Sequence, residues 1–287
     1  MKEFARRDMT ASLSPSQIET FRRDGALLVK SFLDPYWVDL MRGVFEALKD
    51  AGTDMTGYNA EQTGTVPARS TLVKDDVWKD NEDMRRFLRE SPVAANAAAL
   101  MGSKVAKIYE DLLIYKAAGT SAPTPWHQDE PQWPLTGQHL SSVWFCLDPV
   151  TRDTGALRFI AGSNRGPLYV PYVPSSMKEQ LAADMDFFTG GQMPEVDADQ
   201  ERFPVLCFDT EPGDVVFFHP RTIHAAIGNK SAQPRRTFSI RFIGEDVRWQ
   251  PKASVVLPWL KDVDLMEGDA VTGPRFPQFW PQAKAVH

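Results

Sequence analysis

Apolar residues in the first hundred positions recur at the spacing of a helix. Between residues 35 and 52 they form one stripe, made of Trp37, Leu40, Met41, Val44, Phe45 and Leu48. This stripe predicts an amphipathic helix that Gly52 ends. Ser14-Pro15-Ser16-Gln17 predicts an earlier helix start with a capping box, and Ser91-Pro92 predicts an alanine-rich helix that ends at Gly102. We therefore expect residues 1–103 to form a mainly helical layer.

From about residue 104 the apolar runs become short. KVAKIYEDLLIYKAA, SSVWFCLDPV, GALRFIAGS, DVVFFHP and RTFSIRFIG are rich in Val, Ile, Phe and Trp and are bounded by turn-forming residues. These runs predict strands joined by turns, and a series of strands without intervening helices predicts an antiparallel sandwich or barrel. We expect one domain over residues 1–287, with a β core at 104–250 and an irregular tail at 251–287.

One segment, residues 167–203, interrupts the strand pattern. It carries prolines, two glycines in succession and one helix-like piece, SSMKEQLAADMDFF. A long insertion in a compact β domain is often a functional lid. A surface excursion explains the same composition equally well, so both interpretations stay open.

Composition excludes several classes of protein. The net charge is -6 and the isoelectric point is near 5.5, so no nucleic-acid partner is expected. An apolar run of ~18–20 residues is absent, and the N-terminal residues lack the apolar region of a secretory signal. Cys146 and Cys207 lie in apolar runs and are expected to be reduced core residues. We expect a cytoplasmic protein without a membrane partner; its oligomeric state is not readable from the sequence.

The stretch PTPWHQDEP (123–131) raises the question of a metal site. His127 and Asp129 are two residues apart, which puts both side chains on one face of an extended segment. Alone, an H-x-D triplet occurs by chance in many chains. The segment GDVVFFHPRTIHAA adds His219 and His224 as candidate third ligands. Two histidines and one carboxylate hold non-haem Fe(II) and leave one face open for a co-substrate and for oxygen.

A 2-oxoglutarate co-substrate needs a cation for its far carboxylate. Arginine suits this role because its planar fork pairs with both oxygens of a carboxylate. Arg235 and Arg236 lie eleven and twelve residues after His224, at the head of the next predicted strand. A strand, a turn and a strand of this length bring an arginine and a histidine to one side of a sheet.

Three segments together resemble the phytanoyl-CoA dioxygenase family of Fe(II)/2-oxoglutarate oxygenases: PTPWHQD (123–129), VWFCLDPVTRDTGALRFIAGSNRG (143–166) and EPGDVVFFHPRTIHAAIGNKSAQPRRTFSIRF (211–242). The resemblance covers most of the chain, because SPSQIETFRRDGALLVKSFLD also looks like the family's opening helix and strand. It implies a mostly β fold with flanking helices, built on a double-stranded β-helix of the jelly-roll or cupin type. It also implies hydroxylation of an aliphatic carbon of a small molecule, with release of succinate and CO2.

The resemblance assigns roles to individual residues. His127, Asp129 and His224 match the iron ligands, and Arg235 matches the arginine that pairs with the far carboxylate of 2-oxoglutarate. Further positions that help to hold this co-substrate in relatives match Gln128, Trp144 and Lys74. The implied cofactors are Fe(II), 2-oxoglutarate and O2, with ascorbate as a reductant in vitro.

Two positions distinguish this chain within the family. Relatives often carry a hydroxyl residue two positions after the distal histidine, where this chain has Ala226. Another donor, either Thr237 or a water, would have to replace that hydroxyl. Halogenating relatives replace the ligand aspartate by a small residue, so the presence of Asp129 disfavours halogenation.

Other polar residues near these motifs have more ordinary interpretations. His219 precedes a proline and is expected to be a core histidine, and His139 and His287 are expected to be structural or exposed. Glu130 directly follows the metal triplet, and we expect a solvated charge there. Trp126 is interpreted equally as a core residue or as part of a substrate pocket.

Trp133 has the same two interpretations. Arg241 lies at even spacing from Arg235, so its side chain is expected to point inward. It is either a core arginine paired to a carboxylate or an anchor for an anionic substrate. Arg158 and Arg165 are weaker candidates for such an anchor.

Two other classes of protein compete with the oxygenase hypothesis. Cupin-type isomerases and dioxygenases use the same β fold and similar ligands without 2-oxoglutarate, and succinate release separates them from the hypothesis. A non-catalytic binding protein on this fold is the second rival, and the intact ligand set argues against it. A zinc hydrolase ranks below both, because zinc sites favour tetrahedral, histidine-rich sets. The sequence does not identify the substrate.

Overall fold

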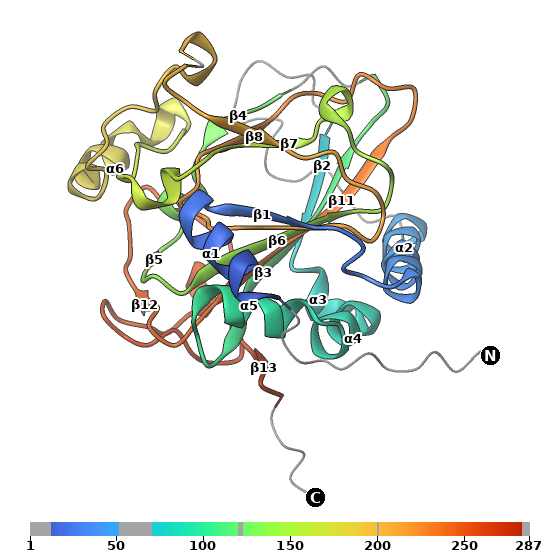
Figure 1. Cartoon of the computed structure of the whole chain (residues 1–287). Coiled ribbons are helices and arrows are strands. Elements are labelled where there is room, and N and C mark those ends of the chain that lie inside the picture. Colours follow the sequence, from blue (N-terminus) through green and yellow to red (C-terminus); the bar gives the residue numbers. More distant parts are fainter. Residues whose placement is uncertain (1–12, 52–70, 120–122, 200, 283–287) are drawn as a thin grey trace, which may run out of the picture.

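Two antiparallel β-sheets form the centre of the molecule (Figure 1). The computed structural model describes residues 13–51, 71–119, 123–199 and 201–282. The major sheet has the spatial order β1 (Ala26–Val29), β9 (Val215–Phe218), β6 (Leu140–Cys146), β11 (Arg235–Ile243), β3 (Ala106–Lys116) and β13 (Gln278–Trp280), with β2 (Thr71–Asp75) also paired to β3. The minor sheet has the order β4 (Thr124–His127), β10 (His224–Ala226), β7 (Leu157–Ile160) and β8 (Val205–Cys207). A third sheet pairs β5 (Leu135–Thr136) with β12 (Arg248–Trp249). The expectation of a mostly β fold with an antiparallel core is confirmed.

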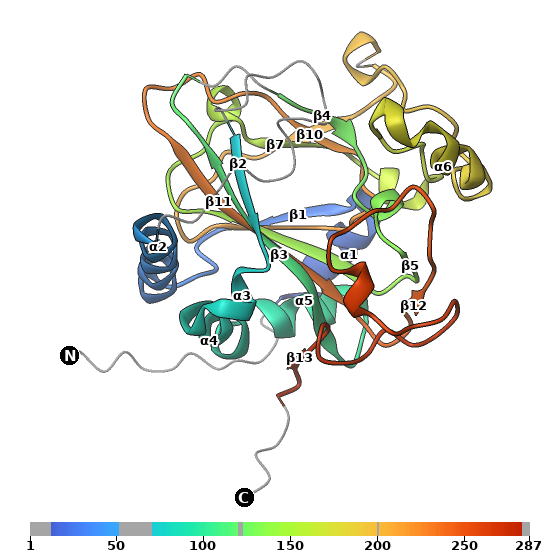
Figure 2. The same cartoon turned by 180° about the vertical axis from the view of Figure 1, so that it is seen from behind.

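Helices cover the face of the major sheet that points away from the minor sheet (Figures 1 and 2). They are α1 (Pro15–Asp24), α2 (Pro35–Asp50), α3 (Val77–Asp80), α4 (Glu82–Glu90) and α5 (Val93–Met101). The predicted capping box is present, because Ser14 and Gln17 each accept a backbone hydrogen bond from the other. Helix α5 ends at Gly102, whose φ of 71° is left-handed and suits glycine. The predicted stop at Gly52 lies outside the described residues.

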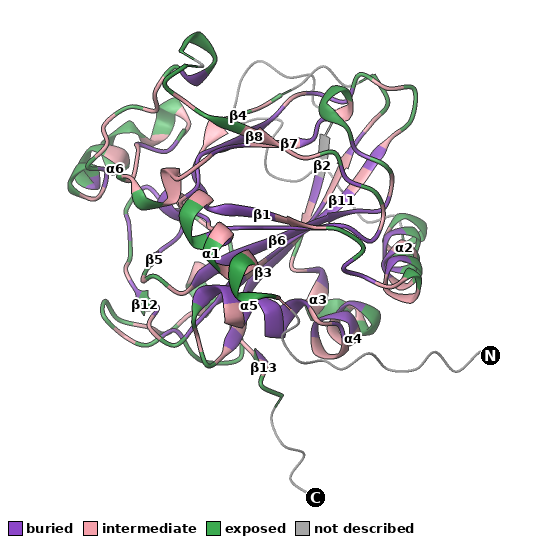
Figure 3. Cartoon of the chain, in the orientation of Figure 1, coloured by how far each residue is buried: buried purple, intermediate pink, exposed green. Residues whose placement is uncertain are grey.

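Alternation along β6 and β11 gives the major sheet two different faces. Val143 and Phe145 of β6 pack with Phe238, Ile240 and Phe242 of β11 in the buried core beneath the helices. Figure 3 shows how continuous the burial of these strands is. The opposite face of β11 carries polar side chains: Arg235, Thr237, Ser239 and Arg241. The space between the two sheets is therefore lined by polar groups of one sheet, as a binding site requires.

The described part of the insertion, residues 167–199 and 201–203, includes α6 (Lys178–Ala183) and packs on the outer face of the minor sheet through a few apolar side chains. Val196 packs there against Ile160 and Ile223, and Tyr169, Met193 and Phe203 surround this small core. Ile223 points outward while its neighbour His224 points inward, as strand alternation requires. These contacts support a segment that covers the sheet from outside. Farther along, the carboxylate of Asp184 accepts hydrogen bonds from the backbone of Ala253 and Ser254 in the tail.

Three short strands lie outside the predicted β core of residues 104–250, although the family resemblance already implied a strand in the segment that contains β1. β1 and β2 belong to the predicted helical layer and β13 to the predicted tail, yet all three extend the major sheet. They have four, five and three residues, which is too short for a period of two to stand out.

The two cysteines match the expectation of reduced thiols packed among apolar residues. Cys146 is buried, Cys207 is half-buried, and both are free. Among the helices in the described ranges, none is long and apolar enough to cross a membrane.

Candidate metal centre

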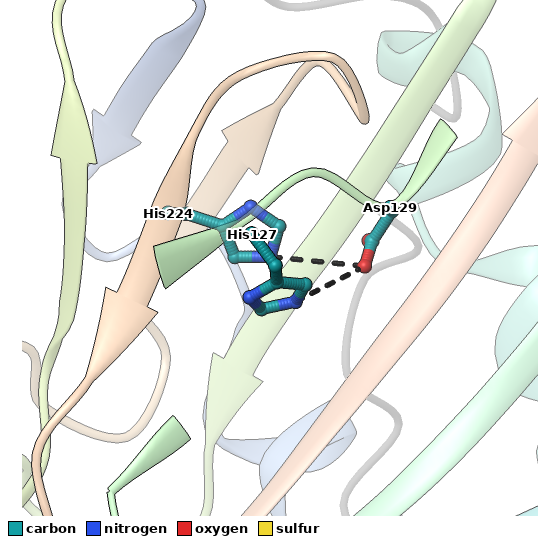
Figure 4. Close-up of side chains that lie close together, drawn as sticks. All are labelled: His127, Asp129 and His224. Carbon is teal, nitrogen blue, oxygen red and sulfur yellow. Dashed lines mark ion pairs between the residues drawn. The ribbon is translucent and has the colours of Figure 1, made fainter. Parts of the chain in front are cut away.

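Two histidines meet across neighbouring strands of the minor sheet. His127 ends β4, His224 begins β10, and the two residues are direct partners in the register of this antiparallel pair. Their ring centroids are 4.1 Å apart. Figure 4 shows both imidazoles beside the carboxylate of Asp129. The structure thus brings together the two histidines that the family resemblance assigned as ligands, although they lie 97 positions apart in the chain.

Asp129 reaches the histidines from a turn. His127 Nε2 lies 3.5 Å and His224 Nε2 lies 3.8 Å from Asp129 Oδ1. The expectation that His127 and Asp129 share one face of a strand is wrong, because β4 ends at His127 and Asp129 has helical dihedrals, φ -76° and ψ -43°. The cause is a 3₁₀ turn at Glu130–Gln132, held by a hydrogen bond from the Asp129 amide to the Pro220 carbonyl.

Each imidazole is oriented by a carbonyl two residues earlier in the chain. His127 Nδ1 donates to the Pro125 carbonyl at 2.8 Å, and His224 Nδ1 donates to the Thr222 carbonyl at 2.9 Å. Both Nε2 lone pairs therefore face Asp129, as outer hydrogen bonds of this kind require. Burial lowers the pKa of His224 to about 4, so this ring is neutral near pH 7.

The donor set suits a divalent metal ion. One donor atom from each of His127, Asp129 and His224 lies within 4.8 Å of the others. Two imidazoles and one carboxylate on one side of an ion form the facial set typical of non-haem Fe(II) oxygenases. Burial acts to raise the pKa of Asp129, but Arg241, His224 and His127 together outweigh it, so the pKa lies well below its usual range. Asp129 is therefore ionised, as a metal ligand must be.

Glu130 joins the two segments that carry the candidate ligands. Its carboxylate accepts hydrogen bonds from Arg221 Nε at 2.9 Å and from Arg221 Nη2 at 2.6 Å. Glu130 is only 2% exposed, so the expectation of a solvated charge is wrong. The partner is 91 positions away, and no local pattern marks it. This bidentate salt bridge fixes the loop after His127 to the loop before His224.

Gln128 points away from the candidate metal centre. Its amide donates to the carbonyls of Pro167 and Arg221, at 3.1 and 2.7 Å, and accepts from the Tyr169 amide at 2.8 Å. The structure therefore places this predicted co-substrate contact at the base of the 167–203 insertion.

Arg235 lies at the start of β11 and is 3% exposed. Its Nη1 donates to the Gly155 carbonyl, and its Nε has no hydrogen-bond partner among the described residues. Burial lowers its pKa to about 10, which still leaves a cation at neutral pH. A Cβ at Gly155 would lie 3.0 Å from Nη1, so glycine makes room for this guanidinium.

Arg236, the alternative, points to the other side of the sheet. Its guanidinium pairs with Asp148 at 2.7 Å and with Glu46 at 3.0 Å. Both carboxylates bind the guanidinium of Arg236 on the side of the major sheet that the helices cover. Of the two arginines that the spacing selected, only Arg235 faces the space between the sheets.

A hydroxyl lies opposite Ala226 on the neighbouring strand. Thr124 of β4 is the register partner of Ala226, and its Oγ1 lies 3.3 Å from Lys116 Nζ. Lys116 in turn is the register partner of Arg235. Thr237, the donor considered from sequence, gives its hydroxyl to the Ile114 carbonyl at 3.3 Å. Sequence reasoning missed Thr124 and Lys116, because only the register of the strands brings them to this place.

Trp144 and Lys74 lie on opposite faces of the major sheet. Trp144 is 2% exposed, and its indole Nε1 has no hydrogen-bond partner in the described part of the chain. A buried, unsatisfied donor of this kind is costly unless a ligand or water meets it. Lys74 is the register partner of Leu113, whose side chain belongs to the core under the helices. Lys74 therefore faces the helical side.

The remaining candidates lie outside the cluster. His219 Nδ1 accepts from the Arg221 amide at 3.1 Å, and His139 lies 3.3 Å from Asp246. Trp126 packs on the outer face of the minor sheet beneath the guanidinium of Arg158, which pairs with Asp197. These contacts make His219 and Trp126 structural residues, and they leave Arg158 away from the space between the sheets. His287 is outside the described residues.

Comparison with known proteins gives the family. Residues 21–237 match the family profile of phytanoyl-CoA dioxygenase (PhyH). The chain belongs to the phytanoyl-CoA dioxygenase family. It is 24% identical over 247 residues to the peroxisomal phytanoyl-CoA dioxygenase of Rattus norvegicus, covering 83% of this chain and 70% of that protein. It is also 24% identical to the ectoine dioxygenase of Stutzerimonas stutzeri (strain A1501), covering 78% and 75%.

Solved structures of this family's fold are similar over nearly the whole chain. SnoK, an alpha-ketoglutarate-dependent carbocyclase from nogalamycin biosynthesis, has a TM-score of 0.71 at 20% identity and covers 93% of this chain and 96% of its own. EctD from S. alaskensis, solved with 2-oxoglutarate and 5-hydroxyectoine, has a TM-score of 0.65 at 19% identity, with 87% and 83% covered. The family and these neighbours are Fe(II)/2-oxoglutarate-dependent dioxygenases, and neighbours have been crystallised with iron and with 2-oxoglutarate. The expected jelly-roll fold and cofactor class are thereby confirmed.

Proposed function

We propose that this member of the family hydroxylates an aliphatic carbon of a small molecule, with His127, Asp129 and His224 as the iron ligands. The observation that carries the proposal is the cluster itself, three donor atoms within 4.8 Å of one another between the two sheets. Fe(II) bound there would, with 2-oxoglutarate and O2, supply the oxidising power that attacks an unactivated carbon and releases succinate and CO2.

Arg235 would hold the far carboxylate of 2-oxoglutarate. It supplies a buried guanidinium whose Nη1 donates to Gly155 and whose Nε has no hydrogen-bond partner among the described residues, so that Nε could meet a ligand. The hydroxyl of Thr124, opposite Ala226, supports the proposal that this neighbouring strand replaces the hydroxyl found in relatives. Trp144 would border the same space, since its free indole donor lies on the inner face of β6.

The protein's own contribution is orientation. The carbonyls of Pro125 and Thr222 fix the two imidazoles, and the pair Glu130–Arg221 fixes the loops that carry them. Reacting groups held in place in this way avoid the entropic cost of alignment during the reaction. Burial of Asp129 and His224 also keeps bulk water away from these two ligands, whereas His127 is half-buried.

Succinate formation tests the proposal directly. The purified protein is supplied anaerobically with Fe(II) and ascorbate, then with 2-oxoglutarate, O2 and a library of small metabolites. We expect succinate above the no-substrate background with at least one compound, and a product heavier by one oxygen atom. His127→Ala and Asp129→Ala should each lower this turnover by more than about a hundredfold, because an incomplete ligand set loses the ion.

His139→Ala is the matched control, since His139 lies outside the cluster and pairs with Asp246. It should retain turnover. If Fe(II)-loaded protein oxidises a substrate without forming succinate, the cupin-type alternative replaces this proposal. If the wild-type protein binds neither Fe(II) nor 2-oxoglutarate, the non-catalytic alternative replaces it.

We further propose that the protein works in the cytoplasm, as the sequence predicts. Two free thiols, Cys146 and Cys207, suit a reducing compartment. The rat relative is named as peroxisomal, which is a property of that protein. Cell fractionation with a compartment marker decides between the two locations.

A further inference from the structure

Arg241 connects the candidate metal centre to the major sheet. It lies on β11, and its Nη2 is 3.3 Å from Asp129 Oδ2. Its Nη1 donates to the carboxylate of Glu110, the residue opposite it on β3. The guanidinium carbon lies 5.5 Å from the ring centroid of Trp133, which is itself buried. Two carboxylates and one aromatic face thus hold the side chain of Arg241 in one position.

The two oxygens of Asp129 have different surroundings. Oδ1 faces both histidines, at 3.5 Å from His127 Nε2 and 3.8 Å from His224 Nε2. Oδ2 is buried, and its charged neighbour is Arg241. A carboxylate free to rotate can bind a metal ion through one oxygen or through both. The guanidinium of Arg241 therefore engages Oδ2, while Oδ1 alone points toward the two histidines.

Glu110 helps to stabilise the buried charge of Arg241. Glu110 is 8% exposed and Asp129 is 4% exposed, so two carboxylates are buried on either side of Arg241. Burial raises the pKa of Glu110, whereas the two carboxylates together raise the pKa of Arg241. The guanidinium compensates both acids, and removal of it would leave two uncompensated buried charges. Arg241 Nη1 donates to Glu110 and Nη2 forms an ion pair with Asp129, while Nε has no hydrogen-bond partner among the described residues. Because two carboxylates already compensate its charge, the role of anchor for an anionic substrate is disfavoured.

We propose that Arg241, held by Glu110, is a positioning residue that restricts Asp129 to a single coordinating oxygen. The inference rests on the proposed role of Asp129 as an iron ligand. An octahedral ion with three protein donors keeps three positions open. A bidentate co-substrate takes two of them, and O2 needs the third. If Asp129 also bound through Oδ2, that third position would be lost.

The test counts open positions without relying on turnover. Wild-type and Arg241→Met proteins are loaded anaerobically with Fe(II) and 2-oxoglutarate, then titrated with nitric oxide as an analogue of O2, and the complex is quantified by electron paramagnetic resonance. We expect Arg241→Met to bind nitric oxide at least about tenfold more weakly, the scale on which loss of an outer partner of a ligand acts. Co(II) absorption, recorded on the same variants without nitric oxide, should show that the metal is still bound.

Arg236→Met is the matched control, because Arg236 is the next residue on the same strand and also pairs with two acids. It should bind nitric oxide as the wild type does. Arg241→Lys should recover part of the affinity, since a lysine keeps one donor for Asp129 but cannot bridge to Glu110.

A purely structural role predicts something different. The double variant Glu110→Gln/Arg241→Met removes the carboxylate that would be left uncompensated, and it keeps the test available if Arg241→Met alone does not fold. We expect this double variant to regain thermal stability while its affinity for nitric oxide stays low. Affinity equal to wild type in a folded, metal-loaded Arg241 variant would overturn the inference. Failure of the wild type to bind Fe(II) or Co(II) would instead overturn the proposed function, and this inference with it.

Discussion

A carbonyl two residues before each histidine sets the direction of both imidazoles in the candidate metal centre. The geometry depends on Pro125 and Thr222, neither of which belongs to the H-x-D motif. The two rings therefore need no rearrangement to present Nε2 to an ion. Arg235 is likewise oriented before any ligand binds, because its Nη1 donates to the Gly155 carbonyl. Its guanidinium remains a cation despite burial.

Arg235→Ala should weaken 2-oxoglutarate binding without loss of the metal site. A charge-assisted hydrogen bond contributes about 1.5–3 kcal/mol, so the concentration of 2-oxoglutarate for half-saturation should rise by roughly tenfold to a hundredfold. The measurement is a titration of 2-oxoglutarate into Fe(II)-loaded protein without O2. Arg236→Ala should leave this titration unchanged, and the opposite ranking of the two variants would move the role away from Arg235.

At the scale of elements, the residue between two candidate ligands anchors the 167–203 insertion. Three backbone groups of Pro167, Tyr169 and Arg221 depend on the amide of Gln128 for their hydrogen bonds. Because Gln128 is 1% exposed, loss of the amide would leave these groups without a partner in a place that water does not reach. The position of the insertion is thereby linked to the strand that carries His127.

Gln128→Leu should loosen this insertion. We expect cleavage within residues 167–203 by a low dose of protease to become several-fold faster, since local opening governs such cleavage. Gln132→Leu serves as the control, because Gln132 lies in the turn four residues later. If cleavage is unchanged and only the affinity for 2-oxoglutarate falls, Gln128 contacts the co-substrate as the family resemblance implies.

For the molecule as a whole, bound metal should stabilise the native state. The ligands come from β4, its following turn and β10, so the complete set exists only in the folded chain. An ion at a hundred times its dissociation constant adds about 2.7 kcal/mol. We expect Co(II) to raise the midpoint of thermal unfolding by several degrees, measured by differential scanning fluorimetry. An equal rise in His127→Ala would mean that the stabilising ion binds elsewhere.

Features that depend on residues close together in the sequence were predictable, and those that depend on residues far apart were less so. The capping box of Ser14 and Gln17 and the helix end at Gly102 involve neighbours in sequence, and both were predictable. Strand content was visible in the longer runs, but not in β13, which has three residues. Family comparison selected the residues that the structure gathers as the metal cluster.

The supporting contacts were not predictable in the same way. Glu130 pairs with Arg221, and Arg241 with Glu110 and Asp129, across 91, 131 and 112 positions respectively. Each of these pairs depends on strand register or loop packing, for which a single sequence carries no signal. Thr124 opposite Ala226 is a further case, because a bulge in β4 shifts that register.

The bridge between Glu130 and Arg221 has a consequence for which metal the protein acquires. This bridge and the oriented imidazoles hold the three donors in place by protein contacts alone. The site therefore does not need one particular metal ion in order to form, and it discriminates little between divalent ions. Divalent copper, nickel and zinc bind nitrogen and oxygen donors more tightly than Fe(II) does. Protein isolated from cells should accordingly carry a mixture of ions that reflects their supply during growth. Removal of that mixture with a chelator, followed by anaerobic addition of iron, should recover catalytic capacity that direct purification conceals.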